Sequence, residues 1–208
     1  MPLIGDHAPE FHAMTTQGKI DFPADYKGSW VVLFSHPADF TPVCTTEFIA
    51  LSRMNETFES LNTKLIGLSI DSLHSHLGWI KSIEALNFNN EGKVKIPFPI
   101  IADISMNVAR KYGMLQTVAN TQTVRAVFII DPEGMIRTIL YYPMSTGRNI
   151  PEIIRILQSL QLNDKTHYST PANWQPGDAV VMGAPLTIEE AQERLESSDN
   201  TIEHLDWY

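Results

Sequence analysis

The sequence has a single cysteine, Cys44, among its 208 residues. One thiol cannot form an intramolecular disulfide, which favours a reducing compartment, and we therefore expect a cytoplasmic location. The sequence also lacks a Gly-rich phosphate loop and a Cys-x-x-Cys pair. It therefore offers no signal for a nucleotide cofactor or for a redox dithiol, and we expect no cofactor.

Positive charge is in deficit as well. The chain has 15 Lys and Arg against 24 Asp and Glu, a formal net charge of −9, which disfavours binding to nucleic-acid phosphates and to anionic membranes. No apolar run approaches the roughly 18 residues of a membrane span. The first residues, MPLIGDHAPEF, lack the basic-then-apolar pattern of a secretory signal. We therefore expect neither nucleic acid nor membrane among the partners.

Short apolar runs rich in β-branched residues predict five strands, and stretches with helical spacing lie between them. The DPEG turn at 131–134 predicts a hairpin between the last two strands. Strands that alternate with helices imply an α/β layer structure, mostly parallel, with one antiparallel pair. The predicted strands are 29–36, 63–71, 97–103, 124–131 and 134–142, and the predicted helices are 42–61, 73–86, 104–112 and 151–162.

The character of the chain changes after about residue 163. The following segment is rich in Pro, Asn, Asp and Thr and has no hydrophobic period until a short helix predicted at 187–196. Thr187 and Glu190 are spaced as a capping box at the start of that helix. Such a polar arm cannot build its own core, so we expect residues 166–208 to pack on the domain formed by 1–165 or across a second subunit. The aromatic residues available for this packing are Trp174, Trp207 and Tyr208.

The cysteine lies just after a junction of strand, loop and helix. With Thr41 as N-cap and Pro42 at the first helical position, Cys44 is the third residue of the helix. Free backbone N–H groups and the positive end of the helix dipole favour an anion there. A lone cysteine inside a helix is usually a small hydrophobic residue, but this position predicts a reactive thiolate.

Residues 37–48, PADFTPVCTTEF, resemble the peroxiredoxin active-site motif, in which a Pro, a Thr and a Cys are separated by three and two residues. With the preceding FSH, the stretch is similar to the one-Cys-like branch, which includes archaeal and bacterial thioredoxin peroxidases. The resemblance extends over nearly the whole chain. It includes GLSIDS at 67–72, IPFPIIAD at 96–103, TVRAVFIIDPEGMIRTILYYP at 123–143 and PANWQPGD at 171–178.

The resemblance implies an α/β thioredoxin-like fold, with a mixed central sheet flanked by helices and an extended C-terminal arm. It also implies that Cys44 reduces hydrogen peroxide and alkyl hydroperoxides through a sulfenic acid. Peroxide is a weak electrophile, so donors must stabilise the leaving oxygen. The Thr41 hydroxyl and the Cys44 backbone N–H can do this. By resemblance, Pro37 belongs to the same motif and shields the thiol from water.

The resemblance also assigns charged residues to the site. Arg125 matches the active-site arginine and, with Thr41, would bind the peroxide, while Arg148 matches a second arginine. Glu47 lies one helical turn after Cys44 and could bridge the two arginines. His36 matches the histidine of the one-Cys branch. Without the resemblance, these would be read as a strand-end Arg, a helix-start Arg, a surface Glu and a packed His.

The partners follow from the same resemblance. With no second thiol, the sulfenic acid needs an external thiol reductant, either a thioredoxin-like protein or a small thiol. In archaeal-type relatives, cysteines lie near an LDW segment; here LDW is 205–207, preceded by His204, and the sequence stops one residue later. Either the protein is a true one-Cys enzyme, or a resolving cysteine lies beyond the given residues. We expect a homodimer that assembles into a ring such as a decamer.

Four rival interpretations carry less weight. A ring-forming chaperone or redox-signalling scaffold is the main alternative, and a dithiol oxidoreductase is disfavoured by the single cysteine. His74 and His76 have H-x-H spacing, but residues two apart diverge on a helix, so we expect no metal site. The GLSID segment resembles a lipase elbow, but Asp71 stands where the second glycine belongs.

Overall fold

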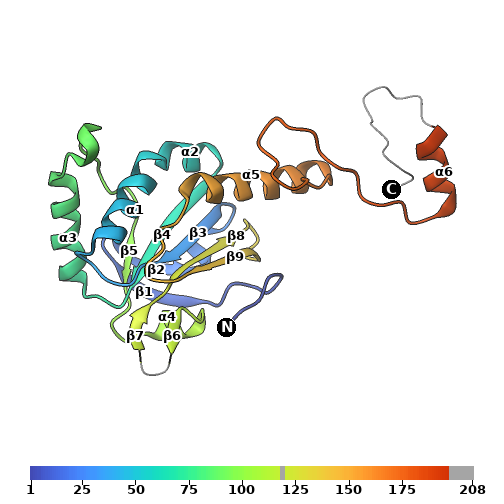
Figure 1. Cartoon of the computed structure of the whole chain (residues 1–208). Coiled ribbons are helices and arrows are strands. Elements are labelled where there is room, and N and C mark those ends of the chain that lie inside the picture. Colours follow the sequence, from blue (N-terminus) through green and yellow to red (C-terminus); the bar gives the residue numbers. More distant parts are fainter. Residues whose placement is uncertain (118–119, 197–208) are drawn as a thin grey trace. The chain divides into compact units, whose positions relative to one another are not determined.

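Seven strands form one mixed sheet in the computed structural model, which describes residues 1–117 and 120–196 (Figure 1). The strand order is β2-β1-β5-β4-β3-β8-β9, and β6 and β7 form a separate two-stranded sheet. The strands are β1 (Phe11–Thr15), β2 (Gly18–Phe22), β3 (Trp30–Ser35), β4 (Thr63–Ser69), β5 (Ile100–Ala102), β6 (Leu115–Thr117), β7 (Asn120–Thr123), β8 (Arg125–Ile130) and β9 (Ile136–Tyr142).

The chain divides into two compact units, residues 1–152 and 153–208. The first contains every strand of both sheets. The α-helices are α1 (Pro42–Arg53), α2 (Asn55–Ser60), α3 (Leu73–Ala85), α4 (Asn107–Lys111), α5 (Ile150–Thr166) and α6 (Ile188–Glu196), and the short 3₁₀ helices are η1 (Ala24–Tyr26) and η2 (Phe88–Asn90). Within the described residues, no helix is both long and apolar enough to cross a membrane.

The directions of the strands correct one prediction. Only the pairs β3–β4 and β4–β5 are parallel, whereas β2–β1, β1–β5, β3–β8 and β8–β9 are antiparallel. The expected mixed sheet is therefore confirmed, but the expectation that it is mostly parallel was wrong. The hairpin β1–β2 was missed because its residues are largely polar or exposed, and its tight turn depends on Gly18 at φ +112°.

The predicted hairpin at 131–134 is confirmed. Gly134 adopts φ +85° and donates its backbone N–H to the Asp131 carbonyl (2.9 Å), while Asp131 Oδ1 accepts from the backbone of Glu133 (3.1 Å) and Met135 (2.8 Å). The hairpin makes β9 the edge of the sheet and leaves β8 paired with β3. This pairing matters for function because β3 leads into the cysteine loop.

Strand β3 shows why both faces of the sheet are covered. All six of its residues are buried, and alternate side chains point to opposite faces. Val31 and Leu33 belong to a core cluster shared with residues of α4, whereas Phe34 contacts Phe48 of α1 edge-on, with ring centroids 5.5 Å apart. Figure 1 shows α1 and α2 on one face of the sheet and α4 on the other.

Three predicted helices have different bounds, and the one expected at 151–162 runs over Ile150–Thr166 as α5. The helix expected at 42–61 is split at Met54, which ends α1 and precedes α2. The helix expected at 104–112 begins only at Asn107, because Met106 adopts the left-handed conformation (φ +58°). The Asp103 carboxylate accepts the backbone N–H of Ala109 (2.7 Å) in the first turn of α4.

The second unit has its own local contacts. Trp174 is buried, and its indole N–H donates to the Asp178 carbonyl (3.2 Å). The Thr187 hydroxyl accepts the Glu190 backbone N–H (3.1 Å), as the predicted capping box requires, but the Glu190 carboxylate accepts from the backbone of Leu186 (2.7 Å) rather than of Thr187. The predictions for His204, the LDW segment, Trp207 and Tyr208 lie outside the described residues.

Candidate active site

Cys44 lies in the first turn of α1, as predicted, and is completely buried. The chain reaches this position directly from β3 through the loop at 36–41. Because β8 runs antiparallel to β3, the first residue of β8, Arg125, lies beside the end of β3 where this loop begins. The sheet therefore brings together a cysteine and an arginine that are 81 positions apart in the sequence.

The Arg125 guanidinium is held from two sides. Its Nη1 lies 3.3 Å from Cys44 Sγ and donates to Glu47 Oε2 (2.8 Å). Its Nε and Nη2 both donate to the Met144 carbonyl (3.0 and 2.8 Å). A planar group with several donors can make these contacts at once. Arg125 thus presents one fixed, always-charged N–H group to the sulfur.

Glu47 joins the two arginines, as the sequence predicted. Its Oε2 accepts from Arg125 Nη1 (2.8 Å) and Arg148 Nη2 (2.6 Å), while its Oε1 accepts from Arg148 Nε (3.0 Å) and the Arg148 backbone (2.9 Å). Arg148 Nη1 also donates to the carbonyls of Ser35 (3.0 Å) and Ala126 (3.2 Å), which lie on the neighbouring strands β3 and β8. The carboxylate therefore fixes both guanidinium groups relative to the sheet.

The charges of this cluster suit a thiolate. Burial alone would raise the pKa of Glu47, but Arg148 and Arg125 hold it below its ordinary value, so Glu47 is an anion at neutral pH. Two arginines and one carboxylate leave one positive charge in excess beside Cys44. A thiolate would bring the buried group to neutrality, which is the arrangement that a low-dielectric site favours.

Thr41 and Pro37 both lie in the loop at 36–41, Pro37 near its start and Thr41 at its end. Thr41 occupies the N-cap position with extended backbone angles, but its side chain makes no capping hydrogen bond. The predicted side-chain cap is therefore wrong: the hydroxyl donates instead to the Ala38 carbonyl (2.9 Å), within the loop. The hydroxyl oxygen can still accept a hydrogen bond, just before the first helical turn that contains Cys44. Pro37 is buried in the same loop.

Comparison with family models supports the meaning of this geometry. Residues 4–139 match the model described as the AhpC/TSA family, and residues 159–198 match the C-terminal domain of 1-Cys peroxiredoxin. A peroxiredoxin of Methanosarcina mazei is 58% identical over 210 residues, covering 100% of this chain and 96% of that protein. The chain belongs to the peroxiredoxin family. A peroxiredoxin of Aquifex aeolicus is 47% identical and covers 100% of this chain and 95% of its own length.

Solved structures agree with the family and the fold. A yeast mitochondrial 1-Cys peroxiredoxin has 42% identity and a TM-score of 0.84, covering 97% of this chain and 96% of the other. A cysteine-to-serine variant of peroxiredoxin 6 from Arenicola marina has 39% identity and a TM-score of 0.83, covering 92% and 88%. The thioredoxin-like fold expected from the sequence is therefore confirmed, and so is the assignment of this peroxiredoxin as a thiol-dependent peroxidase.

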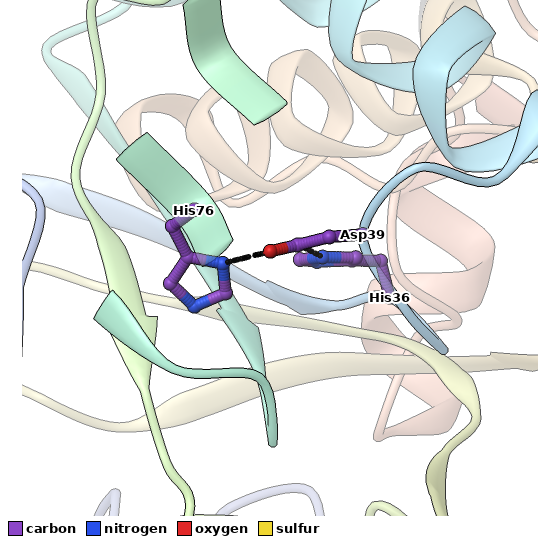
Figure 2. Close-up of side chains that lie close together, drawn as sticks. All are labelled: His36, Asp39 and His76. Carbon is purple, nitrogen blue, oxygen red and sulfur yellow. Dashed lines mark hydrogen bonds and ion pairs between the residues drawn. The ribbon is translucent and has the colours of Figure 1, made fainter. Parts of the chain in front are cut away.

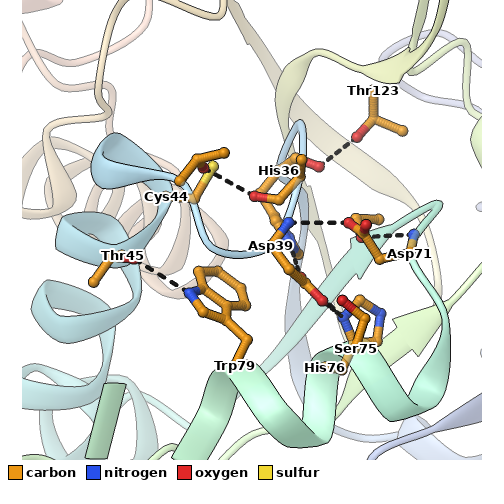
Figure 3. Close-up of polar contacts among 12 residues, drawn as sticks. His36, Asp39, Cys44, Thr45, Asp71, Ser75, His76, Trp79 and Thr123 are labelled. Atoms are coloured by element: carbon orange, nitrogen blue, oxygen red, sulfur yellow. Dashed lines mark hydrogen bonds and ion pairs between the residues drawn. The ribbon is translucent and has the colours of Figure 1, made fainter. Parts of the chain in front are cut away.

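His36 is buried in this peroxiredoxin, and its side chain hydrogen-bonds to Asp39 rather than to the cysteine. Its Nε2 lies 2.9 Å from Asp39 Oδ1, and Asp39 in turn contacts His76 Nδ1 (2.8 Å) (Figures 2 and 3). Within the described residues, these three side chains form the one group close enough together to hold a metal ion, with ligand atoms within 4.8 Å. The observed separations are those of hydrogen bonds. A direct catalytic role for His36 stays a prediction.

The sequence reasoning missed Asp39 and His76. It considered His76 only with His74, and the structure separates the two: His76 is buried and His74 is exposed on α3. A usable signal was present, because His76 precedes the buried residues Trp79 and Ile83 by three and seven positions, on one helical face. A histidine on a buried face requires a hydrogen-bond partner, and Asp39 supplies it.

The buried state of His36 predicts a pH-dependent stability. Burial lowers the pKa of His36 below its usual value, against the opposing effect of Asp39. Below about pH 6.5 the unfolded chain therefore binds a proton that the folded chain resists, and the free energy of unfolding falls by up to about 1.4 kcal/mol per pH unit from this group. The loss stops once pH falls below the folded-state value.

His36→Gln provides the matched comparison, because its amide can still donate to Asp39 but does not titrate. Urea unfolding from about pH 7.5 to about pH 5 measures both proteins, and the histidines outside the His36–Asp39–His76 cluster contribute equally to each. We expect the wild type to lose more stability than His36→Gln over this range. Parallel stability curves would contradict the buried, neutral state of His36.

Proposed function

We propose that this peroxiredoxin reduces hydrogen peroxide and alkyl hydroperoxides with Cys44 as the nucleophile and Arg125 as its charge partner. The observation that carries the proposal is the 3.3 Å contact between Arg125 Nη1 and the buried Cys44 Sγ. Arg125 keeps its charge at all physiological pH values. It can therefore stabilise the thiolate before the reaction and the peroxide oxygen during it.

In the proposed reaction, the Cys44 thiolate attacks one peroxide oxygen and the O–O bond breaks. The sulfur keeps that oxygen as a sulfenic acid, and the other oxygen leaves as hydroxide or alkoxide, which takes a proton from solvent to become water or alcohol. Negative charge grows on the leaving oxygen in the transition state, so donors fixed in advance lower the barrier. Arg125 and the Cys44 backbone N–H are the groups we assign to this task, and the Thr41 hydroxyl joins them once it rotates its hydrogen away from the Ala38 carbonyl.

Glu47 and Arg148 act on the reaction through Arg125 in this proposal. Glu47 accepts from both arginines, and Arg148 is anchored to the carbonyls of Ser35 and Ala126. The side chains are nearly fully buried, so their geometry is set by packing rather than by water. We assign Pro37, also buried, the exclusion of water from the thiol.

An external thiol completes the cycle in our proposal. Cys44 is the only cysteine among these 208 residues, so none of them supplies a second thiol to attack the sulfenic acid. The yeast mitochondrial structure is described as showing thiol resolution through glutathione and thioredoxin systems. We assign the same chemical class of reductant, a small thiol or a thioredoxin-like protein, to this chain, and a cytoplasmic location.

We also propose that the protein works as a homodimer that assembles into a ring such as a decamer. The support is the polar C-terminal segment, which the comparison relates to the C-terminal domain of 1-Cys peroxiredoxin. A main domain at 1–165 with residues 166–208 as a dimerisation arm is the organisation that fits this proposal. Light scattering at micromolar protein concentration tests it, and a monomer would contradict it.

Mass spectrometry of the intact protein tests the nucleophile directly. Equimolar hydrogen peroxide is expected to add one oxygen atom at Cys44, and excess peroxide to add two or three, because a sulfenic acid without a reducing thiol oxidises further. Peptide mapping should place the added oxygen on Cys44 rather than on the methionines. An unchanged Cys44 mass after peroxide treatment would refute the proposed function.

The need for an external thiol is a separate prediction. With dithiothreitol, peroxide consumption should continue for many turnovers, whereas without it the protein should consume only stoichiometric amounts. Non-reducing gels should show monomers, with at most a symmetric Cys44–Cys44 by-product, because no two different thiols exist. Sustained turnover by these 208 residues without any added thiol would contradict the one-Cys cycle.

A further inference from the structure

Asp39 ties the loop before α1 to two other parts of the fold. Its carboxylate contacts His36 Nε2 (2.9 Å) at the end of β3 and His76 Nδ1 (2.8 Å) on α3. Its backbone N–H donates to Asp71 Oδ2 (3.0 Å), in the turn between β4 and α3. The Asp39 and His76 side chains are 1% and 0% exposed. One buried residue therefore anchors the loop at 36–41 through both its side chain (Figure 2) and its backbone N–H (Figure 3).

The hydrogen bonds of His76 determine its protonation state. Nδ1 faces the Asp39 carboxylate, and Nε2 lies 3.2 Å from the Ile101 carbonyl oxygen. Both neighbours are acceptors, and neither can donate. A neutral imidazole has a single N–H, so one nitrogen would face an oxygen lone pair with its own lone pair. Because the ring is fully buried, water cannot relieve that contact, and only the doubly protonated ring satisfies both neighbours.

The same carboxylate orients the ring of His36. His36 Nε2 donates to Asp39 Oδ1, while His36 Nδ1 is buried without a hydrogen-bond partner in the described structure. A proton on that nitrogen would be an unpaired buried donor, so Nδ1 carries a lone pair and the ring is neutral. One positive charge on His76 and one negative charge on Asp39 then balance.

A metal ion fits this cluster less well than protons do. Zinc with bonds of roughly 2.0–2.2 Å holds its ligand atoms about 3.3 Å or more apart in a tetrahedral site. Here the nitrogen–oxygen pairs are at 2.8 and 2.9 Å, the lengths of charge-assisted hydrogen bonds. The Ile101 carbonyl at the second ring nitrogen of His76 suits either state, because a metal-ligating histidine usually donates its other N–H to such an acceptor. Zinc binding is therefore the alternative that the experiment must exclude.

We propose that Asp39 and His76 are positioning residues for the peroxide reaction, forming a buried ion pair that holds the loop at 36–41 and fixes His36 with its proton on Nε2. The inference rests on the proposed function, because this loop carries Pro37 and Thr41 to the start of the cysteine helix. Neither residue touches Cys44 through a hydrogen bond in the described structure. Their effect on the rate is transmitted by the geometry of the loop.

Nitrogen-15 NMR of histidine-labelled wild-type protein at neutral pH tests the ion pair first. The expected spectrum has both His76 nitrogens protonated and His36 protonated on Nε2 only, with site-specific His36→Gln and His76→Gln samples assigning the signals. A bare nitrogen on His76 would overturn the proposal. Because this measurement involves no peroxide, it tests the ion pair even if the proposed function fails.

Variants then connect the pair to the chemistry. His76→Asn keeps a hydrogen-bond donor near the Nδ1 position and His76→Gln keeps one near the Nε2 position, but neither side chain carries the positive charge. Asp39→Asn replaces the carboxylate with an amide, whose N–H donor would then face a histidine ring N–H. Each is expected to slow single-turnover oxidation of Cys44 by at least about tenfold, because small displacements of catalytic groups have large effects. Asp39→Asn should also release His36 into a mixture of tautomers. His74→Gln, on the exposed face of the same helix, should change neither the rate of Cys44 oxidation nor the His36 tautomer.

Three outcomes would each contradict a different part of the proposal. Folded His76 and Asp39 variants, judged by near-UV circular dichroism, that oxidise at the wild-type rate would overturn the positioning role. Stoichiometric zinc bound by the wild type and lost in all three His76 and Asp39 variants would replace the ion pair with a metal site. If wild-type Cys44 is itself not oxidised by peroxide, the proposed function fails instead, while the NMR result on the ion pair still decides its existence.

Discussion

Cys44→Ser is expected to reduce peroxide consumption to the rate of a protein-free solution, a loss of at least about 1000-fold, or about 4 kcal/mol in the barrier. The reason is chemical, because the serine hydroxyl is not ionised at neutral pH and attacks peroxide poorly. No other cysteine can take over, since Cys44 is the only one in the sequence. Peroxide consumption in the presence of dithiothreitol measures the effect.

The fold should survive this substitution. Serine is close to cysteine in shape, and its hydroxyl can accept a hydrogen bond from Arg125, whose Nη1 lies 3.3 Å from the sulfur. Far-UV and near-UV circular dichroism should therefore match the wild type. Retained turnover in Cys44→Ser would place the peroxidase chemistry elsewhere. A wild type without turnover that nevertheless protects a heat-unfolded client protein would favour the chaperone or scaffold alternative.

The local part of the site could be predicted because it depends on neighbours in the sequence. A strand, a short loop and a helix that begins with Thr41 and Pro42 place Cys44 in the first helical turn whatever the rest of the fold does. Glu47 follows one turn later, on the same face. Only the detail of the cap was wrong, because the Thr41 hydroxyl donates to the Ala38 carbonyl within the loop.

The distant residues could not be placed from the sequence by physical reasoning alone. Arg125 and Arg148 meet Glu47 from 78 and 101 positions away, and only the family resemblance singled them out. Asp39 and His76, which are 37 positions apart, had no such guide and were missed. Contacts of this kind depend on which strands are neighbours, and periodicity carries no information about strand order.

Strand direction shows the same limit. Alternating strands and helices correctly indicated the parallel strands β3, β4 and β5, whose crossovers are helical. The sequence pattern did not indicate that β8 would pair with β3 in the opposite direction. That antiparallel pairing has a direct functional consequence, since it brings the start of β8 to the end of β3. With a parallel β8, Arg125 would lie at the opposite end of the strands from Cys44.

Arg125→Ala is expected to lower the second-order rate constant of Cys44 oxidation by at least about tenfold, equal to about 1.4 kcal/mol or more. The substitution removes the guanidinium contact to Cys44 Sγ. It also changes the charge of the buried cluster: Arg148 alone then balances Glu47, and a thiolate at Cys44 would be one uncompensated negative charge. Both the nucleophile and the leaving oxygen lose their cationic partner.

Arg125→Lys separates the charge from the geometry. A lysine keeps the positive charge, but it has no planar fork with which to contact the Met144 carbonyl, Glu47 and Cys44 together, as Arg125 does. We therefore expect a rate between those of the wild type and Arg125→Ala. Stopped-flow measurement of single-turnover oxidation gives the rate constants. The reaction is followed by the fluorescence of Trp79, which contacts Thr45 next to Cys44, or by competition with a peroxide-consuming reference enzyme. A rate for folded Arg125→Ala equal to that of the wild type would remove Arg125 from the reaction.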